Sequence, residues 1–286
     1  MQEYIAFTKM QGVGNDFVVI NSMHRPSKNW PMLAQQLCDR RFGVGADGLL
    51  VLEDSQEADL AMRMYNPDGT EDVCGNGLRC VARFAVEHAM VEKNSLQIAT
   101  LAGVRRAEVK QTPNEGRYEV TVTMGEPGLL PQDVPALLPD NAEQPCLLTL
   151  QNGEKIAVRV LSTGSAHAVT FVDELPGDEE FLRISPQVEC HALFPERVSL
   201  MWCKKEAEGV LRLRIWERGA GETWGCGTGA CAATVAAVLQ GIAEPGEKVA
   251  VMSRGGSLNI VWQPGKQIEM TGPASVVFEG CYLLEL

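Results

Sequence analysis

Cys74 and Cys226 are the residues best suited to chemistry, because each begins a glycine-rich turn directly before a predicted helix. The turns are Cys74-Gly75-Asn76-Gly77 and Cys226-Gly227-Thr228-Gly229. The first amides of a helix lack intrahelical partners and carry roughly half a positive charge, which can lower the pKa of a thiol from about 8.5 to roughly 3.5–7.5. Glycines also let a carboxylate approach these amides closely. The pattern predicts two acid–base thiols beside a bound carboxylate.

Two such thiols could invert the α-carbon of an amino acid. One sulfur removes the proton from one face while the other delivers a proton to the opposite face, which a single base cannot do. An α-carboxylate on the amides of Gly75-Asn76 and Gly227-Thr228 gains charge as the proton leaves, and preorganised amides stabilise that charge. Thiols with a pKa near neutrality suit this task. We therefore predict racemisation or epimerisation of a small-molecule amino acid without a cofactor.

Other interpretations of the two turns remain open. Both sulfurs could be inert turn residues, or Cys74 and Cys226 could form a disulfide in a thiol redox or binding protein. Zinc is disfavoured because Cys-x5-Cys and Cys-x4-Cys are not the usual close spacing of its ligands, and no histidine follows in register. We expect no metal site.

The two cysteine turns lie within copies of one longer pattern, which predicts a duplicated domain. Two related halves often face one another across a pseudo-twofold axis, and we expect equivalent residues on opposite walls of a cleft. The repeat shows duplication but not orientation. Besides the turns, the matched segments are 14–19 with 164–169, 62–66 with 213–217, 100–103 with 253–256, and 124–127 with 270–273.

Alternating apolar residues predict strands, and each half has one prominent predicted helix after its cysteine turn. Residues 230–239 are apolar nearly all round and should be buried on every side, while Leu78, Val81, Ala82 and Ala85 form an apolar stripe. We predict an α/β (α+β) fold of two pseudo-symmetric domains, each a mostly antiparallel sheet or barrel around a central helix. The domains are 1–126 plus 273–286, and 127–272, with the link in 127–145. The predicted strands are 61–65, 105–110, 118–124, 211–216, 257–262 and 267–270.

The composition narrows the class of protein. Hydrophobic residues make up 45% and charged residues 22%, as in soluble globular proteins. The net charge of −12 argues against nucleic acid and anionic membranes as partners. No apolar run approaches the roughly 18 residues needed to span a bilayer, and no signal peptide is apparent, so we expect a cytoplasmic protein. A homodimer is expected, although the sequence does not reveal the oligomeric state. We interpret Cys38, Cys146, Cys190, Cys203 and Cys281 as small buried apolar residues.

Six motifs in this order resemble the diaminopimelate epimerases over nearly the whole chain, from residue 7 to about residue 280. They are residues 9–17 (KMQGVGNDF), 41–48 (RFGVGADG), 66–69 (NPDG), 74–80 (CGNGLRC), 217–223 (ERGAGET) and 226–231 (CGTGAC).

The resemblance implies an isomerase that is independent of pyridoxal phosphate and metals and interconverts L,L- and meso-diaminopimelate for lysine and peptidoglycan synthesis. It implies that Cys74 and Cys226 are the acid–base pair and that Gly75-Asn76 and Gly227-Thr228 hold the α-carboxylate. The further implied residues are Asn15 and Asn66 at the substrate, Glu217 and Arg218 on its polar groups with Arg218 at the distal carboxylate, and His167 and Glu217 tuning the thiols.

Structural interpretations of these further residues remain open. Asn15 and Asn66 could serve only in turns, His167 could be a core histidine, and Arg218 could form a surface ion pair with Glu217.

Two departures from the family bear on the substrate. Ser165 and Ser199 stand where the family usually has asparagine, in the half of the pocket that holds the distal end of diaminopimelate. Serine is shorter and has one donor hydrogen where an amide has two. A lost charge-assisted hydrogen bond costs about 1.5–3 kcal/mol. Diaminopimelate remains the expected substrate, and a racemase of another amino acid is the alternative.

Overall fold

The computed structural model describes residues 3–24, 28–112, 118–139, 142 and 144–284. The chain forms two compact units, Met1–Thr123 with Thr271–Leu286, and Met124–Met270. The boundaries lie within three residues of those predicted from the sequence. The chain passes from one unit to the other inside β8 (Tyr118–Gly125) and again inside β17 (Ile268–Pro273). The stretch 127–145, where we expected the link, lies in the second unit.

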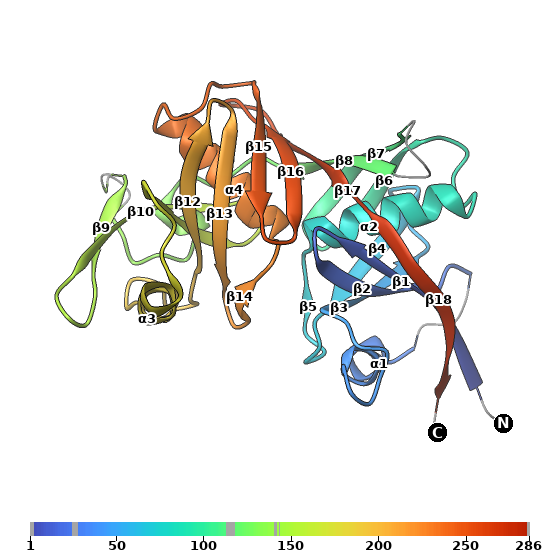
Figure 1. Cartoon of the computed structure of the whole chain (residues 1–286). Helices are drawn as coiled ribbons and strands as arrows, with labels where there is room; N and C mark the ends of the chain where they lie inside the picture. Colours follow the sequence, from blue (N-terminus) through green and yellow to red (C-terminus); the bar gives the residue numbers. More distant parts are fainter. Residues whose placement is uncertain (1–2, 25–27, 113–117, 140–141, 143, 285–286) are drawn as a thin grey trace. The chain divides into compact units, whose positions relative to one another are not determined.

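The first and last strands of the chain are neighbours in the first unit, because β18 (Ser275–Leu284) pairs antiparallel with β1 (Glu3–Gly12). In Figure 1 the red strand β18 runs beside the blue strand β1. The other elements are β2 (Asn15–Asn21), α1 (Trp30–Cys38), β3 (Gly48–Glu53), β4 (Leu60–Tyr65), β5 (Glu71–Asp72), α2 (Gly75–Glu87), β6 (Ser95–Thr100) and β7 (Gly103–Gln111).

The second unit repeats this order of elements. After a short 3-10 helix, η1 (Pro131–Asp133), an added strand β9 (Cys146–Thr149) pairs with β10 (Lys155–Ser162). The other elements are β11 (Ala166–Phe171), α3 (Asp178–Glu189), β12 (Ser199–Ala207), β13 (Val210–Glu217), β14 (Gly221–Thr223), α4 (Gly227–Leu239), β15 (Lys248–Ser253) and β16 (Gly256–Val261).

Strand pairing confirms the duplication. In the first unit β1 and β2 are antiparallel, β2 and β3 parallel, and β3 and β4 antiparallel, and β4 then pairs in parallel with β6. The second unit has the same directions for β10, β11, β12, β13 and β15. A helix connects each first parallel pair, as parallel strands require. The α+β class is confirmed, and the sheets are mixed, with antiparallel pairs in the majority.

Helix α4 is enclosed by its own unit. Its residues 227–238 are all buried, so the predicted burial of 230–239 is confirmed except at Leu239, which is exposed. Strands β10 to β13, β15 and β16 contact it, so the sheet curves around the helix (Figure 1). The predicted apolar stripe of α2 is likewise buried. In each unit one helix with a cysteine at its start therefore occupies the concave side of a sheet.

Helices α1 and α3 were not among the predicted helices, although both carry recognisable signals. Asn29 caps α1 by accepting a hydrogen bond from the amide of Met32 at 3.3 Å. Three acidic residues occupy the first turn of α3, and Phe181, Ile184 and Val188 form its buried stripe. These helices pack against β3 and β4, and against β12 and β13, respectively.

The prediction that five cysteines are small buried residues is correct for two of them. Cys38 and Cys203 are buried, Cys146 is half-buried, and Cys190 and Cys281 are exposed. Cys190 ends α3 and Cys281 lies on β18, positions where one side of the element faces solvent. All nine cysteines lie in the described ranges and are free thiols. No helix within those ranges is long and apolar enough to cross a membrane.

Gly229 lies so close to β12 that a side chain does not fit. A methyl group on its Cα would overlap the sulfur of Met201. We expect Gly229→Ala to lower the free energy of unfolding by about 1–3 kcal/mol, as overpacking does, when measured by urea denaturation. In a Met201→Ala background the same substitution should cost much less, because the overlapping atom is gone. An equal cost in both backgrounds would contradict this contact.

Candidate active site

The sulfur of Cys74 caps helix α2. Cys74 is the N-cap residue in extended conformation, and its Sγ accepts a hydrogen bond from the amide of Gly77 at 3.3 Å. The sulfur also lies 3.8 Å from Oδ1 of Asn15 and donates to it as a thiol. Nδ2 of Asn76 donates to the same oxygen at 3.3 Å. The predicted residues Asn15, Cys74 and Asn76 therefore form one hydrogen-bonded group.

The sulfur of Cys226 caps helix α4 in the same way, with the amide of Gly229 as donor at 3.3 Å. Its Sγ is 3.3 Å from Oγ1 of Thr228. Ser165 donates to that Oγ1 at 3.4 Å. Thr163 on the adjoining turn holds the carbonyl of Thr228 at 2.9 Å, which fixes the first turn of the helix.

The two helix starts correspond residue by residue. Asn15 is the first residue of β2 and Ser165 directly precedes the equivalent strand β11, and Asn76 and Thr228 follow their cysteines by two residues. In both units the residue at the strand start is hydrogen-bonded to the residue in the helix turn. The duplication thus extends to the amide that each sulfur accepts from. The side-chain contacts differ, because Cys74 contacts Asn15 on the strand and Cys226 contacts Thr228 in the helix turn.

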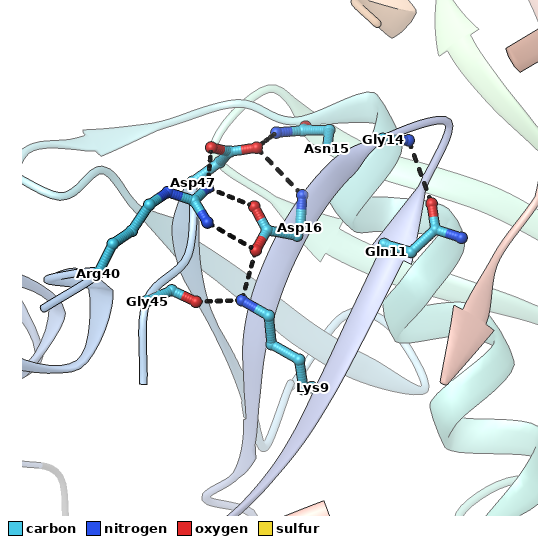
Figure 2. Close-up of polar contacts among 8 residues, drawn as sticks. All are labelled: Lys9, Gln11, Gly14, Asn15, Asp16, Arg40, Gly45 and Asp47. Carbon is cyan, nitrogen blue, oxygen red and sulfur yellow. Dashed lines mark hydrogen bonds and ion pairs between the residues drawn. The ribbon is translucent and has the colours of Figure 1, made fainter. Parts of the chain in front are cut away.

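A charged network contacts the amide nitrogen of Asn15 (Figure 2), whose oxygen faces Cys74. Nδ2 of Asn15 donates to Asp47 at 2.8 Å. Nη2 of Arg40 donates to Asp47 at 2.7 Å and to Asp16 at 2.6 Å. Lys9 is buried and pairs with Asp16 at 2.5 Å. Burial alone would raise the pKa of Asp16, but hydrogen bonds from Arg40 and Lys9 outweigh it and lower the pKa from 3.8 to about 2.

Asn66 and Glu217 are also equivalent, at the ends of β4 and β13. Nδ2 of Asn66 donates to the hydroxyl of Thr70 at 3.1 Å, and the hydroxyl of Thr223 donates to Glu217 at 2.5 Å. Backbone hydrogen bonds from Asn66 to Thr70 and from Gly69 to Asn66 close a turn. Asn66 therefore does serve in a turn, as one interpretation of the sequence held.

Cys226 departs from the expectation of a lowered thiol pKa. The residue is buried, and burial raises the pKa of the thiol well above 9.0. The nearby carboxylate of Glu217, which accepts a hydrogen bond from the thiol, raises this pKa further. The hydrogen bonds from Thr228 and from the Gly229 amide act in the opposite direction but are outweighed. Cys226 is accordingly a protonated thiol at neutral pH in this conformation.

His167 is completely buried on β11. Its Nε2 lies 3.1 Å from the hydroxyl of Ser165, while Nδ1 has no hydrogen-bond partner among the residues that the structure describes. Burial, with a smaller effect of the Arg218 charge, lowers the pKa of His167 to about 3. Among the described residues, hydrogen bonds connect the neutral imidazole to Cys226 through Ser165 and Thr228.

Ser199 and Arg218 contact one another through the backbone. Oγ of Ser199 accepts a hydrogen bond from the amide of Arg218 at 3.1 Å. The exposed Arg218 side chain donates to the carbonyl of Glu196 at 3.3 Å. Buried Glu189, which sequence reasoning missed, accepts from the amide of Gly219 at 2.8 Å and holds the same turn.

Sequence reasoning also assigned no role to Lys9, Asp16, Arg40 and Asp47. The signal was available, because all but Arg40 lie within the two motifs at residues 9–17 and 41–48. Within the described ranges, no group of three or more His, Cys, Asp or Glu side chains is placed to hold a metal ion.

The family model of diaminopimelate epimerase matches residues 7–130 and 159–277. A diaminopimelate epimerase of Carboxydothermus hydrogenoformans is 42% identical over 283 residues, which cover 97% of this chain and 99% of the relative. The chain belongs to the diaminopimelate epimerase family. A second member, from Acetivibrio thermocellus, is 40% identical over 283 residues, covering 96% of this chain and 97% of the relative. The predicted family and enzyme class, an isomerase, are confirmed.

Solved structures share the fold at low sequence identity. A hydroxyproline epimerase from Agrobacterium vitis aligns with a TM-score of 0.73 and 16% identity over 98% of this chain and 93% of that chain. A PhzF-family phenazine biosynthesis protein of Bacillus anthracis aligns with a TM-score of 0.70 and 17% identity over 99% of this chain and 100% of that chain. These likenesses confirm the two-domain fold of the family.

The buried neutral His167 makes stability depend on pH. Its folded pKa of about 3 lies below the ordinary 6.5, so the unfolded chain binds a proton first as the pH falls. At pH 5 this costs the folded state about 2 kcal/mol. Between pH 7 and pH 5 we expect the free energy of unfolding of His167→Gln to fall by about 2 kcal/mol less than that of the wild type. Urea denaturation followed by fluorescence measures this difference. The same pH dependence in both proteins would contradict the assignment.

Proposed function

We propose that this chain epimerises the α-carbon of an amino acid without a cofactor, using Cys74 and Cys226 as the acid–base pair. L,L-diaminopimelate is the first substrate to test, because the similar relatives are named for this activity. The observation that carries the proposal is the equivalence of the two helix starts. Each presents a sulfur that accepts a hydrogen bond from a first-turn amide, and inversion requires two proton-transferring groups, one for each face of the α-carbon.

The proton inventory of the reaction balances within the enzyme and substrate. A thiolate takes the α-proton and becomes a thiol, while the electron pair of the C–H bond passes into the carboxylate as an enediolate. The other thiol then delivers its proton to the opposite face and becomes a thiolate. The amides of Gly75-Asn76 and Gly227-Thr228 are proposed to hold the carboxylate, where helix N-terminal amides stabilise the added charge. Each turnover leaves the two sulfurs in exchanged protonation states.

Glu217 is proposed to set the protonation state of Cys226, and His167 the orientation of the hydroxyl groups beside it. Glu217 accepts a hydrogen bond from the thiol and disfavours the thiolate, which keeps Cys226 protonated in the absence of substrate. His167, which is neutral, orients Ser165 and through it Thr228. Asn15 and Asn66 are proposed substrate contacts at the other helix start.

The distal end of the substrate is where this chain differs from its family. The hydroxyls of Ser165 and Ser199 contact protein groups, namely His167 with Thr228, and the Arg218 amide. Recognition of a distal carboxylate is therefore assigned chiefly to the exposed Arg218 guanidinium. The engaged serines also favour a second candidate function, racemisation of an amino acid with a different distal group.

Exchange of the α-hydrogen tests the reaction. We expect wild-type protein in D2O to incorporate deuterium at the α-carbon of L,L-diaminopimelate without added cofactor, measured by mass spectrometry. Cys74→Ser and Cys226→Ser should each lower the rate by about 10²–10⁴-fold, because a serine hydroxyl is a poor acid–base group at neutral pH. Exposed Cys190→Ser is the matched control and should exchange at the wild-type rate. Absence of exchange together with a reducible Cys74–Cys226 bond would instead support a thiol redox protein.

A panel of L-amino acids, separated by chiral chromatography, tests the substrate. We expect L,L-diaminopimelate to be converted fastest, and Ser165→Asn and Ser199→Asn each to lower its KM, because an amide can restore a direct contact worth roughly ten- to a hundredfold in affinity. Faster inversion of another amino acid, with a KM for diaminopimelate unaffected by either substitution, would favour the alternative racemase. The homodimer expected from the sequence is a separate proposal, tested by light scattering.

A further inference from the structure

The carboxamide of Asn15 lies between the Asp47 carboxylate and the sulfur of Cys74. Its Nδ2 donates to Oδ2 of Asp47 at 2.8 Å, and its Oδ1 accepts from Asn76 at 3.3 Å and from the thiol of Cys74 at 3.8 Å. A carboxylate can only accept hydrogen bonds, so the nitrogen end of the amide must point toward Asp47. The oxygen end is consequently the one that meets the sulfur.

Asp47 is itself held in a single orientation (Figure 2). Its amide donates to the carbonyl of Asp16 at 2.8 Å, and its Oδ2 accepts from the amide of Asp16 at 3.1 Å. Arg40 holds the other carboxylate oxygen at 2.7 Å, and Lys9 anchors the loop through the carbonyl of Gly45. Charge-assisted hydrogen bonds of this kind are stronger than neutral ones. Rotation of the Asn15 amide would place two acceptors in contact and break this arrangement.

The position equivalent to Asp47 in the second unit carries no carboxylate. Asp47 directly precedes β3, and the residue that directly precedes the equivalent strand β12 is the buried Val198. The position equivalent to Asn15 is Ser165, whose hydroxyl can rotate. The Asp47 carboxylate therefore acts on Cys74 through Asn15, whereas the carboxylate at Cys226 is that of Glu217, at a different position of its unit.

We propose that Asp47 is a positioning residue that fixes the Asn15 carboxamide with its oxygen toward Cys74, so that Cys74 is favoured as the thiol in the substrate-free protein. The opposite amide orientation would direct an N–H group to the sulfur and favour the thiolate. This inference rests on the proposed function only for its consequence in catalysis. The state of Cys74 itself can be measured without substrate.

The test is the pH dependence of alkylation of Cys74 by iodoacetamide, because the thiolate is the reactive form. The tryptic peptide 64–79 contains Cys74 and no other cysteine, so mass spectrometry reads this residue alone. In Asp47→Asn the amide of Asn15 can rotate, since the new side chain can donate as well as accept. We expect the midpoint to move to lower pH by about one unit, and alkylation below the midpoint to be about tenfold faster.

Asp39→Asn is the matched control. Asp39 lies on the same loop and accepts the amides of Arg41 and Phe42 at 2.7 and 2.8 Å, away from Asn15. This variant is expected to keep the wild-type midpoint, as is Asp47→Glu, which retains an acceptor-only carboxylate. An unchanged midpoint in Asp47→Asn, or an equal shift in Asp39→Asn, would overturn the proposal.

A second variant keeps the test decisive if Asp47→Asn does not fold. Asn15→Ser places at this position the residue found at the equivalent place in the other unit, and it removes the carboxamide oxygen from Cys74. Its midpoint should also move to lower pH, and Asp47→Asn should cause no further shift in this background. An unchanged midpoint in Asn15→Ser overturns the inference. Failure of the proposed function is recognised separately, as a wild-type protein that exchanges no α-hydrogen while these alkylation profiles still hold.

Discussion

The first turns of helices α2 and α4 are buried, and a buried amide without a hydrogen-bond partner is costly. In both units a cysteine sulfur at the N-cap supplies one partner, at 3.3 Å from the amide of Gly77 or Gly229. Because the following residues are enclosed by the sheet, each sulfur is held at the positive end of its helix and cannot leave it without exposing an unpaired amide. This constraint places the reactive groups, and it also requires glycine where the helix passes closest to β12.

The same helix start is used with different surroundings in the two units. Cys226 is buried and its thiol pKa is raised by burial and by Glu217, while Cys74 is half-buried and bonded to Asn15. Both surroundings favour the thiol in the substrate-free protein, and a two-base inversion requires that one of the two sulfurs lose its proton before it can accept the α-proton. Duplication explains the common geometry, and the residues behind each cysteine explain why a different group accepts the proton of each thiol.

Much of the site could be predicted from the sequence, because its signals are local. The cysteine turns, the buried helix after Cys226 and five repeated segments all follow from residue types at short spacing. Helices α1 and α3 were missed although capping and acidic first-turn signals were present. The predicted low thiol pKa failed for Cys226 because burial, which spacing does not reveal, outweighs the helix amides. Cys190 and Cys281 were misplaced for the same reason, since an apolar residue type does not specify which side of an element faces solvent.

The sequence alone determined which atoms are available: two thiols at helix starts, the residues that follow them, and two serines where the family has asparagine. Only the tertiary structure decided how these groups are oriented. Asp47 meets Asn15 across 32 residues of chain, and the hydroxyl of Ser199 meets the Arg218 amide across 19. Such contacts form because the pairing of parallel strands brings particular strand ends together. The tertiary structure sets the direction of these hydrogen bonds and the burial of each group. Both depend on neighbours in space, which local residue patterns do not specify.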